Sequence, residues 1–201
     1  MIAAGVHGSG SRADAQRDRI LGAALKCFIE HGFHAASMAS IADTAQMSAG
    51  LMYRYFENKN AIVLGIIERQ LEEKRAVLRQ LHSSNDIAAG LLTAFERWCA
   101  ADPDAMSPAL FLEMSAEATR NPPLAEALRS FDAGMRMELQ AWLGRDRGLG
   151  GMGLPPECAA FRALSLQCFI DGLVLRSVRD PGVDRDQLQA AVREQVERLT
   201  R

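Results

Sequence analysis

Residues 37–59 read SMASIADTAQMSAGLMYRYFENK, and they hold two helix-sized pieces joined by a tight turn. Ser37 and Ser48 each suit a helix N-cap, because a serine hydroxyl accepts an unpaired amide of the first turn. The pieces, about 38–46 and 48–56, are too short and too closely joined to lie side by side in a bundle. They must cross steeply, so the spacing predicts a helix-turn-helix.

The second piece places polar and small side chains off its buried face. Met52 and Phe56 are four residues apart and face the core, whereas Tyr53 and Tyr55 flank Arg54 on other faces. A phenol on a rigid arm is well suited to donate to a phosphate oxygen. This pattern favours double-stranded DNA as the partner.

Gly50 and Lys59 fit the same interpretation. Gly50 lies in the first turn of the second piece, where it costs roughly 1 kcal/mol relative to Ala, and its use is a close backbone approach. Asn58 suits the cap of the next helix, with Lys59 at its first position. A cation there faces the positive helix end, which is mildly unfavourable unless a phosphate lies nearby.

Composition limits the alternatives for the whole chain of 201 residues. Apolar residues make up 48% and charged residues 24%, and strand formers are sparse, so we expect an all-α protein with a real core. The net charge is −2: residues 1–60 carry six Lys and Arg against five Asp and Glu, and the rest carry 17 against 20. Without a basic stripe, binding to DNA must rest on a few well-placed contacts.

Hydrophobic periodicity divides the chain into an arm and two helical domains. We expect a flexible arm at 1–12, a three-helix DNA-binding domain at 13–60 and a larger helical ligand-binding and dimerisation domain at 61–201. About nine helices are predicted, at 13–31, 38–46, 48–56, 60–81, 86–101, 107–120, 121–143, 156–179 and 184–201. Three arginines near the start of the first helix form either a solvated face or contacts to backbone phosphates, and Arg12 and Arg17 are better phosphate candidates than Arg19.

Residues 32–61, GFHAASMASIADTAQMSAGLMYRYFENKNA, resemble the DNA-binding segment of the tetracycline-repressor (TetR) family of bacterial regulators. The resemblance implies that Ser37 and Lys59 hold phosphates and that Tyr53 and Tyr55 grip the backbone. It also implies that Ser48, Ala49 and Gly50 approach base edges in the major groove. Arg54 lies between the two tyrosines and completes the set of candidate DNA-binding residues.

Three positions depart from the family pattern. Gln46 stands where the family prefers Gly, and Tyr55 replaces a commoner His. Ala49 replaces a frequent Lys or Arg, which removes a reader of guanine. Contact of the Ala49 or Leu51 side chain with thymine methyl groups is then the expected substitute.

The resemblance also implies a homodimer, a palindromic operator and a small-molecule effector bound among the later helices. The dimer would form through the last two helices, with candidates Leu166, Phe169, Leu173, Leu188 and Val192. Candidate effector-lining residues are Phe95, Trp98, Phe111, Met114, Phe131, Met135 and Phe169, although such side chains are usually core. Acids within apolar helices need partners when buried, with Arg136 or Arg176 as candidates for Glu113, Glu117, Asp132 and Asp171. An acid without such a partner would instead favour a cationic effector.

Enzyme and cofactor functions find little support. The four histidines have no neighbour at a spacing that suggests a catalytic pair, and the four separated cysteines indicate neither a metal site nor a cofactor. In the loop GRDRGLGGMGLPP (144–156), Gly148, Gly150 and Gly153 have a dinucleotide-like spacing. A helix pattern precedes them, so we expect a flexible linker.

The N-terminus is not a secretory signal, and no apolar run is long enough to span a membrane. We therefore expect a cytoplasmic repressor that a small apolar or amphipathic molecule releases from DNA. The alternative is a dimeric helical ligand-binding or interaction protein without specific DNA binding.

Overall fold

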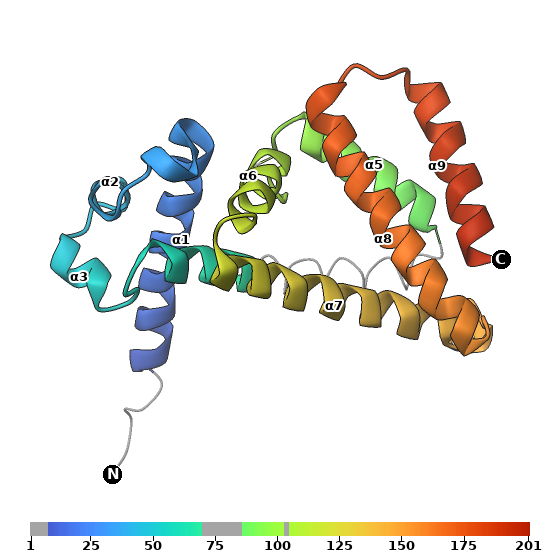
Figure 1. The fold of residues 1–201 in the computed structure, drawn as a ribbon, viewed down its shortest axis with the longest axis horizontal. Coiled ribbons are helices and arrows are strands. Elements are labelled where there is room, and N and C mark those ends of the chain that lie inside the picture. Colours follow the sequence, from blue (N-terminus) through green and yellow to red (C-terminus); the bar gives the residue numbers. More distant parts are fainter. Residues whose placement is uncertain (1–7, 70–85, 103–104) are drawn as a thin grey trace, which may run out of the picture. The chain divides into compact units, whose positions relative to one another are not determined.

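The computed structural model describes residues 8–69, 86–102 and 105–201, and within these ranges the chain is helical and contains no strand (Figure 1). The described residues form nine helices, which confirms the all-α prediction. Segment 59–69 is one of them, and the others are α1 (Gly8–Ala35), α2 (Met38–Thr44), α3 (Ala49–Tyr53), α5 (Ile87–Cys99), α6 (Pro108–Ala118), α7 (Pro122–Gly144), α8 (Pro156–Arg179) and α9 (Arg185–Thr200). A single 3₁₀ turn, η1, spans Arg147–Leu149. The helix expected at 60–81 continues outside the described residues beyond Arg69.

The chain folds into two compact units. The first comprises residues up to Arg69 together with Glu113–Ala125, and the second comprises Gln70–Leu112 and Glu126–Arg201. The chain therefore returns to the first unit through the end of α6 and the start of α7. The division expected from the sequence, 13–60 and 61–201, contained no such return.

The first unit has its core on one face of α1. Ile20, Leu21, Ala24 and Phe28 recur at helical spacing and are all buried, as their periodicity predicts. The helix is interrupted at Gly32, which has φ 78° and ψ 160°. A side chain would be strained at that positive φ, so glycine allows the chain to turn there and Phe33 to fold back into the core.

The turn between α2 and α3 is defined by two serine caps. Ser37 and Ser40 form a reciprocal capping box, and Ser48 Oγ accepts from Leu51 N at 3.2 Å. Gln46 between the helices has φ 52°, a left-handed conformation that explains why the related pattern prefers glycine. Arg19 donates through Nη2 to the Gln46 carbonyl at 3.2 Å and holds this turn against α1.

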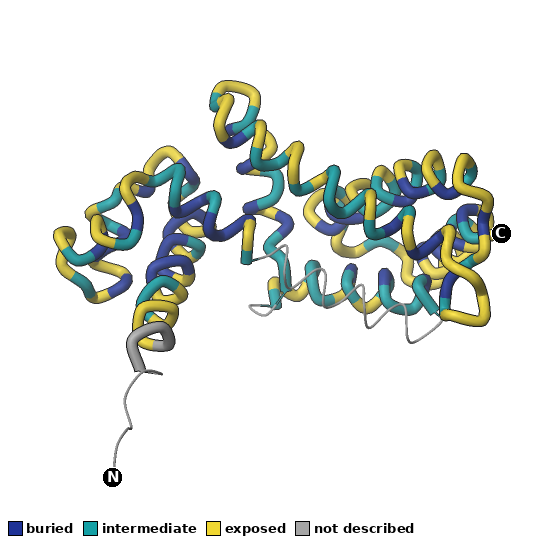
Figure 2. The backbone as a smooth tube through the Cα atoms, turned by 90° about the horizontal axis from the view of Figure 1, so that it is seen from below, coloured by how far each residue is buried: buried dark blue, intermediate teal, exposed yellow. Residues whose placement is uncertain are grey.

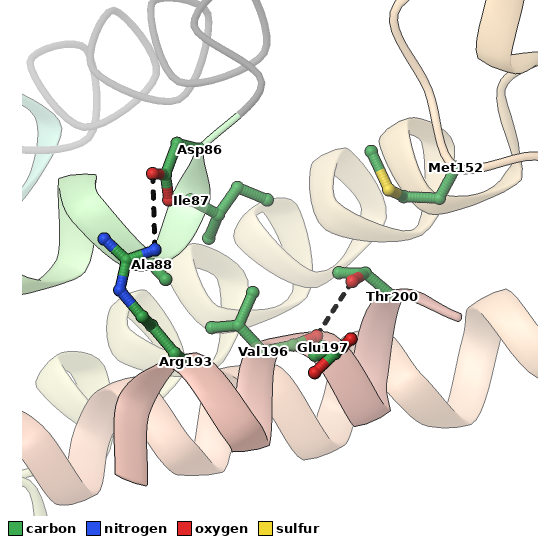
Figure 3. A pocket seen from close by; sticks show the side chains of 8 residues that line it. All are labelled: Asp86, Ile87, Ala88, Met152, Arg193, Val196, Glu197 and Thr200. Atoms are coloured by element: carbon green, nitrogen blue, oxygen red, sulfur yellow. Dashed lines mark hydrogen bonds and ion pairs between the residues drawn. The ribbon is translucent and has the colours of Figure 1, made fainter. Parts of the chain in front are cut away.

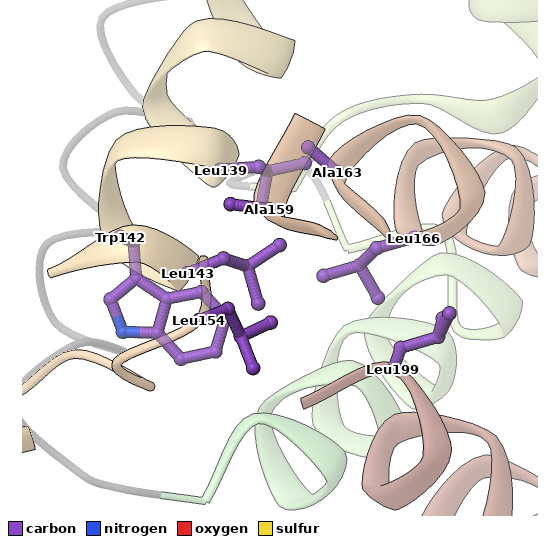
Figure 4. Packing of buried hydrophobic residues seen from close by; sticks show 8 residues of the cluster. All are labelled: Leu139, Trp142, Leu143, Leu154, Ala159, Ala163, Leu166 and Leu199. Carbon is purple, nitrogen blue, oxygen red and sulfur yellow. The ribbon is translucent and has the colours of Figure 1, made fainter. Parts of the chain in front are cut away.

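The second unit packs α5 beside α8 and α9. Helix α7 packs against α8 through apolar side chains. Along these helices buried and exposed positions alternate at helical spacing (Figure 2). One apolar cluster joins α7, α8 and the end of α9 (Figure 4), and its buried members are Leu139, Trp142, Leu143, Leu154, Ala159, Ala163, Leu166 and Leu199. A second cluster joins α5, α8 and α9, with buried members Ala88, Leu91, Phe95, Leu173, Leu188, Val192 and Val196.

The glycine-rich loop between α7 and α8 is a built turn, so the expectation of a flexible linker was wrong. Trp142 donates through Nε1 to the Gly150 carbonyl at 3.1 Å, and Gly153 N donates to Arg145 O at 2.8 Å. A Cβ at Gly151 would lie 2.1 Å from the Arg145 carbonyl oxygen. The glycines therefore allow backbone to pack on backbone, which the sequence spacing alone does not reveal.

Candidate nucleic-acid interface

The short helix α3 presents one buried and one exposed face. Met52 is fully buried beneath it, whereas Tyr53 keeps 54% of its surface exposed. Ala49, Gly50 and Arg54 are also exposed. The buried residue anchors the helix, so small side chains at its start and polar side chains at its end face outward together.

The remaining sequence-predicted residues around α3 differ in how free they are. Ser37 Oγ accepts from Ser40 N at 3.0 Å, and Ser48 Oγ caps α3, so both exposed hydroxyls already have a structural task. The Ser48 hydroxyl can still donate its proton to an added acceptor, whereas Ser37 Oγ already donates to Ser40 Oγ at 3.2 Å. Tyr55 is half-buried, and its backbone N–H donates to Met52 O at 2.9 Å.

Two arginines of α1 are engaged within the unit. The Arg17 guanidinium lies 4.5 Å from the centroid of the Phe56 ring and 3.7 Å from Glu68 Oε2. Arg19 holds the Gln46 carbonyl. Sequence reasoning considered these arginines as a solvated face or as phosphate contacts, and it missed their internal partners.

Lys59 lies at the start of segment 59–69, but its amine reaches the end of α1. Nζ donates to Phe33 O at 2.7 Å and to Ala36 O at 3.0 Å, and it lies 4.3 Å from the centroid of the Phe33 ring. Burial lowers the pKa of the Lys59 amine, and the nearby Glu117 carboxylate raises it by less. The Lys59 amine, which the sequence predicts to contact a phosphate, is thus hydrogen-bonded to carbonyl groups of its own unit in this structure.

Two acids of α6 lie against the same end of α1. Glu113 Oε2 accepts from Phe33 N at 3.1 Å. The buried Glu117 lies 3.0 Å from His34 Nε2 and accepts from Arg120 Nε at 2.7 Å. Sequence analysis expected a buried acid to need a partner, which holds for Glu117, whereas Glu113 is exposed. The candidates Arg136 and Arg176 were wrong for both, because the partners come from the end of α1 and, for Glu117, also from Arg120 just beyond α6.

The seven candidate effector-lining residues are divided between the two units. Phe95 is fully buried inside the α5–α8–α9 cluster, and Trp98 and Phe169 pack partly buried against it. Met114 is buried in the first unit. Phe111, Phe131 and Met135 are half-buried in the second unit. Several of these side chains therefore serve as core, which is the usual role of apolar residues at helical spacing.

A pocket of about 350 Å³ opens elsewhere in the second unit (Figure 3). Asp86 forms one wall at the start of α5, where its Oδ2 lies 3.6 Å from Arg193 Nη1 of α9. None of the seven candidates lines this pocket, whose residues are Asp86, Ile87, Ala88, Met152, Arg193, Val196, Glu197 and Thr200. Its lining combines apolar side chains with the charged groups of Asp86, Arg193 and Glu197.

Helix α8 carries apolar side chains on two faces. Four of the five dimer candidates, Leu166, Leu173, Leu188 and Val192, are buried within the single chain, and Phe169 is half-buried. The outward face instead presents Phe161, Leu164 and Val178, with 57%, 46% and 46% of their surfaces exposed. Cys168 is exposed on the same helix.

Among the described helices, α8 is also the one that is long and apolar enough to cross a membrane, judged by length and composition. Its most apolar window has a mean hydropathy of 1.5, and 28% of that window is buried. Core helices of soluble proteins meet the same criterion, so this is weak support for a membrane segment.

Comparison with known families gives two matches that together cover most of the chain. Residues 20–66 match the model described as bacterial regulatory proteins, tetR family. Residues 87–201 match the model described as BetI-type transcriptional repressor, C-terminal. The two matches are separated by residues 67–86, which follow the helix-turn-helix region.

Individual relatives agree with these matches. The regulator UidR of Escherichia coli (strain K12) is 32% identical over 124 residues, which span 60% of this chain and 60% of UidR. The regulator BetI of Agrobacterium fabrum is 28% identical over 169 residues, spanning 80% of this chain and 76% of BetI. Among solved structures, Salmonella enterica GusR superposes with a TM-score of 0.67 at 26% identity, covering 91% of this chain and 96% of GusR.

Proposed function

Because this chain belongs to the tetR family of bacterial regulatory proteins, we propose that it is a ligand-responsive repressor of transcription. Members of this family bind DNA operators and small-molecule effectors and act as dimers. The observation that carries the proposal is the exposed surface of α3, where Ala49, Gly50, Tyr53 and Arg54 surround the buried anchor Met52. Its place of action is the cytoplasm, where the DNA lies.

We assign base contacts to the start of α3 and backbone contacts to its end. Gly50 has open space around its Cβ position, so the α3 backbone can approach a base edge closely there. Ala49 offers a methyl group for contact with a thymine methyl, and Ser48 retains a hydroxyl proton to donate. Tyr53 and Arg54 supply donors to phosphate oxygens, Tyr55 adds a third, and Ser37 holds a phosphate at the start of α2.

The dimer forms through α8 and α9, with the outward face of α8 at its centre. Phe161, Leu164 and Val178 would otherwise be exposed to water on α8, and a second copy of the same chain covers them under two-fold symmetry. Two copies of α3 would then read half-sites about 34–36 Å apart, one helical turn of DNA. This symmetry requires a palindromic operator.

The effector binds in the second unit and favours one arrangement of the dimer. Its differential affinity for the two arrangements sets the loss of operator affinity. The pocket at Asp86, Met152 and Arg193 suits a small amphipathic molecule, because both apolar and charged side chains line it. The agreement of residues 87–201 with BetI-type repressors supports repression as the output.

The DNA assignment is tested by selecting bound duplexes from a random library with the purified protein. Tyr53→Ala is expected to lower affinity about 10-fold for all selected sequences alike, because a phosphate donor carries no sequence information. Ala49→Lys is expected to change which sequences are selected. Ile29→Ala, which truncates another half-exposed side chain in the same unit, serves as the control and should bind like the wild type.

Wild-type binding with no dependence on salt, or full affinity in Tyr53→Ala, would refute the DNA assignment.

For the effector, a library of small amphipathic molecules is screened by thermal shift, since a bound ligand raises the apparent stability. A hit that raises the melting temperature but leaves DNA affinity unchanged would contradict the proposed response.

A further inference from the structure

The end of α1, residues 32–36, is a short helical turn set off by a kink, and it leads directly into the Ser37 cap of α2. The helix is broken at Gly32, and Ala36 N returns to Gly32 O at 3.3 Å. Carbonyl groups at a helix end have no partner within the helix and must find one elsewhere. The position of this segment therefore decides where α2 begins.

The Lys59 amine supplies those partners. It donates to Phe33 O and Ala36 O at 2.7 and 3.0 Å, so two of its three N–H bonds are used on the segment. It also sits over the Phe33 ring. The amine thus points to the negative end of α1, away from the unfavourable positive end of its own helix.

Carboxylates of α6 hold the same segment from its N–H side. Glu113 accepts from Phe33 N, and the buried Glu117 lies against His34. Asn121 Nδ2 donates to Asn60 Oδ1 at 3.1 Å, which joins the start of α7 to the residue after Lys59. Residues 32–36 are therefore bonded through both their carbonyl and their amide groups.

We propose that Lys59 is a positioning residue for DNA binding, which fixes residues 32–36 and the start of α2 from inside the unit without contacting a phosphate. Glu117 supports it by holding the other side of the segment. This inference rests on the proposed function, and it departs from the phosphate contact that the family resemblance implies for Lys59.

The geometry favours this role over a phosphate contact. An amine that moved to a phosphate would give up two short hydrogen bonds and leave the Phe33 and Ala36 carbonyls unpaired. Lys59 is half-buried, and burial lowers the pKa of its amine, whereas Arg54 lies on the exposed face. An internal tie and a phosphate contact predict different responses to salt.

The decisive experiment measures the salt slope of binding to a random-sequence duplex of about 40 base pairs, using the full-length protein in about 25–200 mM salt. Each lost phosphate contact reduces the magnitude of the negative slope of log K against log salt by about 0.9, and the loss of one contact in each of two subunits would reduce it by about 1.8. We expect Lys59→Met to weaken binding about 10-fold with the slope unchanged. Lys26→Met, which removes an exposed lysine of α1, is the matched control and should bind like the wild type.

The direction in which Glu117→Gln changes DNA affinity distinguishes the positioning role of Lys59 from a phosphate contact. If Lys59 positions residues 32–36, loss of the carboxylate weakens DNA binding, and the double variant with Lys59→Met loses less than the two single losses combined. If Lys59 holds a phosphate, removing a nearby negative charge strengthens binding. A reduced slope in Lys59→Met, or stronger binding by Glu117→Gln, overturns the inference.

The amine can also be observed in the wild-type protein, so the test does not depend on a variant that folds. We expect the ζ-nitrogen resonance of Lys59, assigned from its loss in Lys59→Met, to keep its position when DNA is added. A large shift with scalar coupling to phosphorus would establish a phosphate contact and refute the positioning role. Absence of salt-dependent binding by the wild type would instead contradict the proposed function itself.

Discussion

At the scale of single residues, the left-handed backbone conformation of Gln46 is strained and lowers the free energy of unfolding, although the surrounding turn keeps it in place. A non-glycine residue in this conformation costs roughly 1–2 kcal/mol, whereas glycine adds about 0.4–1 kcal/mol of chain entropy to unfolding. Gln46→Gly is therefore expected to raise the free energy of unfolding by about 0.5–1 kcal/mol. Urea unfolding checks this, and Gln46→Ala is the control that keeps the strain. Equal stability of the two variants would contradict the explanation.

The Cys99 thiol gives a pH dependence of definite sign. Burial raises its pKa above the ordinary value of 9.0, Arg185 lowers it and Glu96 raises it by less. Because the folded pKa is the higher one, the contribution of this thiol to stability is complete below pH 9.0 and is lost as the pH rises through the folded value.

The measurement compares the free energies of unfolding of the wild type and Cys99→Ala between about pH 8 and 10.5. The advantage of the wild type should shrink toward the alkaline end. A difference that stays constant over this range would show that the thiol titrates alike in both states.

At the scale of elements, the turn between α7 and α8 depends on one glycine more than on the others. A side chain at Gly151 would meet the Arg145 backbone, whereas nothing lies within 4 Å of the Cβ position at Gly148. Gly151→Ala is expected to destabilise the protein by about 2–3 kcal/mol, because backbone must move to accept it. Gly148→Ala is the matched control and should stay within about 0.5 kcal/mol of the wild type. Thermal unfolding decides, and equal melting temperatures would contradict a tightly built turn.

The starts of several helices were predictable from the sequence because capping is local, whereas α1 begins at Gly8 and not at the expected residue 13, and α3 ends at Tyr53 and not at the expected residue 56. Ser37, Ser48, Asn58, Asp86 and Asp184 each accept an amide of the turn that follows, as their residue types predict. The partners of charged side chains were not predictable. Phe33 and Glu113, for example, meet across 80 residues of sequence. Periodicity reports that a side chain is buried, but it does not identify what it touches.

At the scale of the whole molecule, periodicity again shows which residues are buried but not what they contact, and this explains why the sequence predicted buried residues for the dimer interface. Both faces of α8 are apolar, so the sequence predicts that the helix meets two surfaces without showing which face meets which. The structure turns Leu166 and Leu173 inward and leaves Phe161, Leu164 and Val178 outward. Helix α8 thus remains the proposed interface, with different residues at its centre.

Leu164→Glu tests this interface. Two copies of the charge would be buried at a symmetric contact, so we expect the dimer to weaken at least about 100-fold, which corresponds to about 2.8 kcal/mol. Light scattering during gel filtration should then show a monomer, with α-helical content preserved. Met137→Glu places the same charge on a residue of α7 that is 65% exposed and should leave the dimer intact. Alkylation gives an independent readout, because the exposed Cys168 of α8 should react faster in Leu164→Glu than in the wild type. Equal reaction rates, or an unchanged dimer, would show that a different surface joins the two copies.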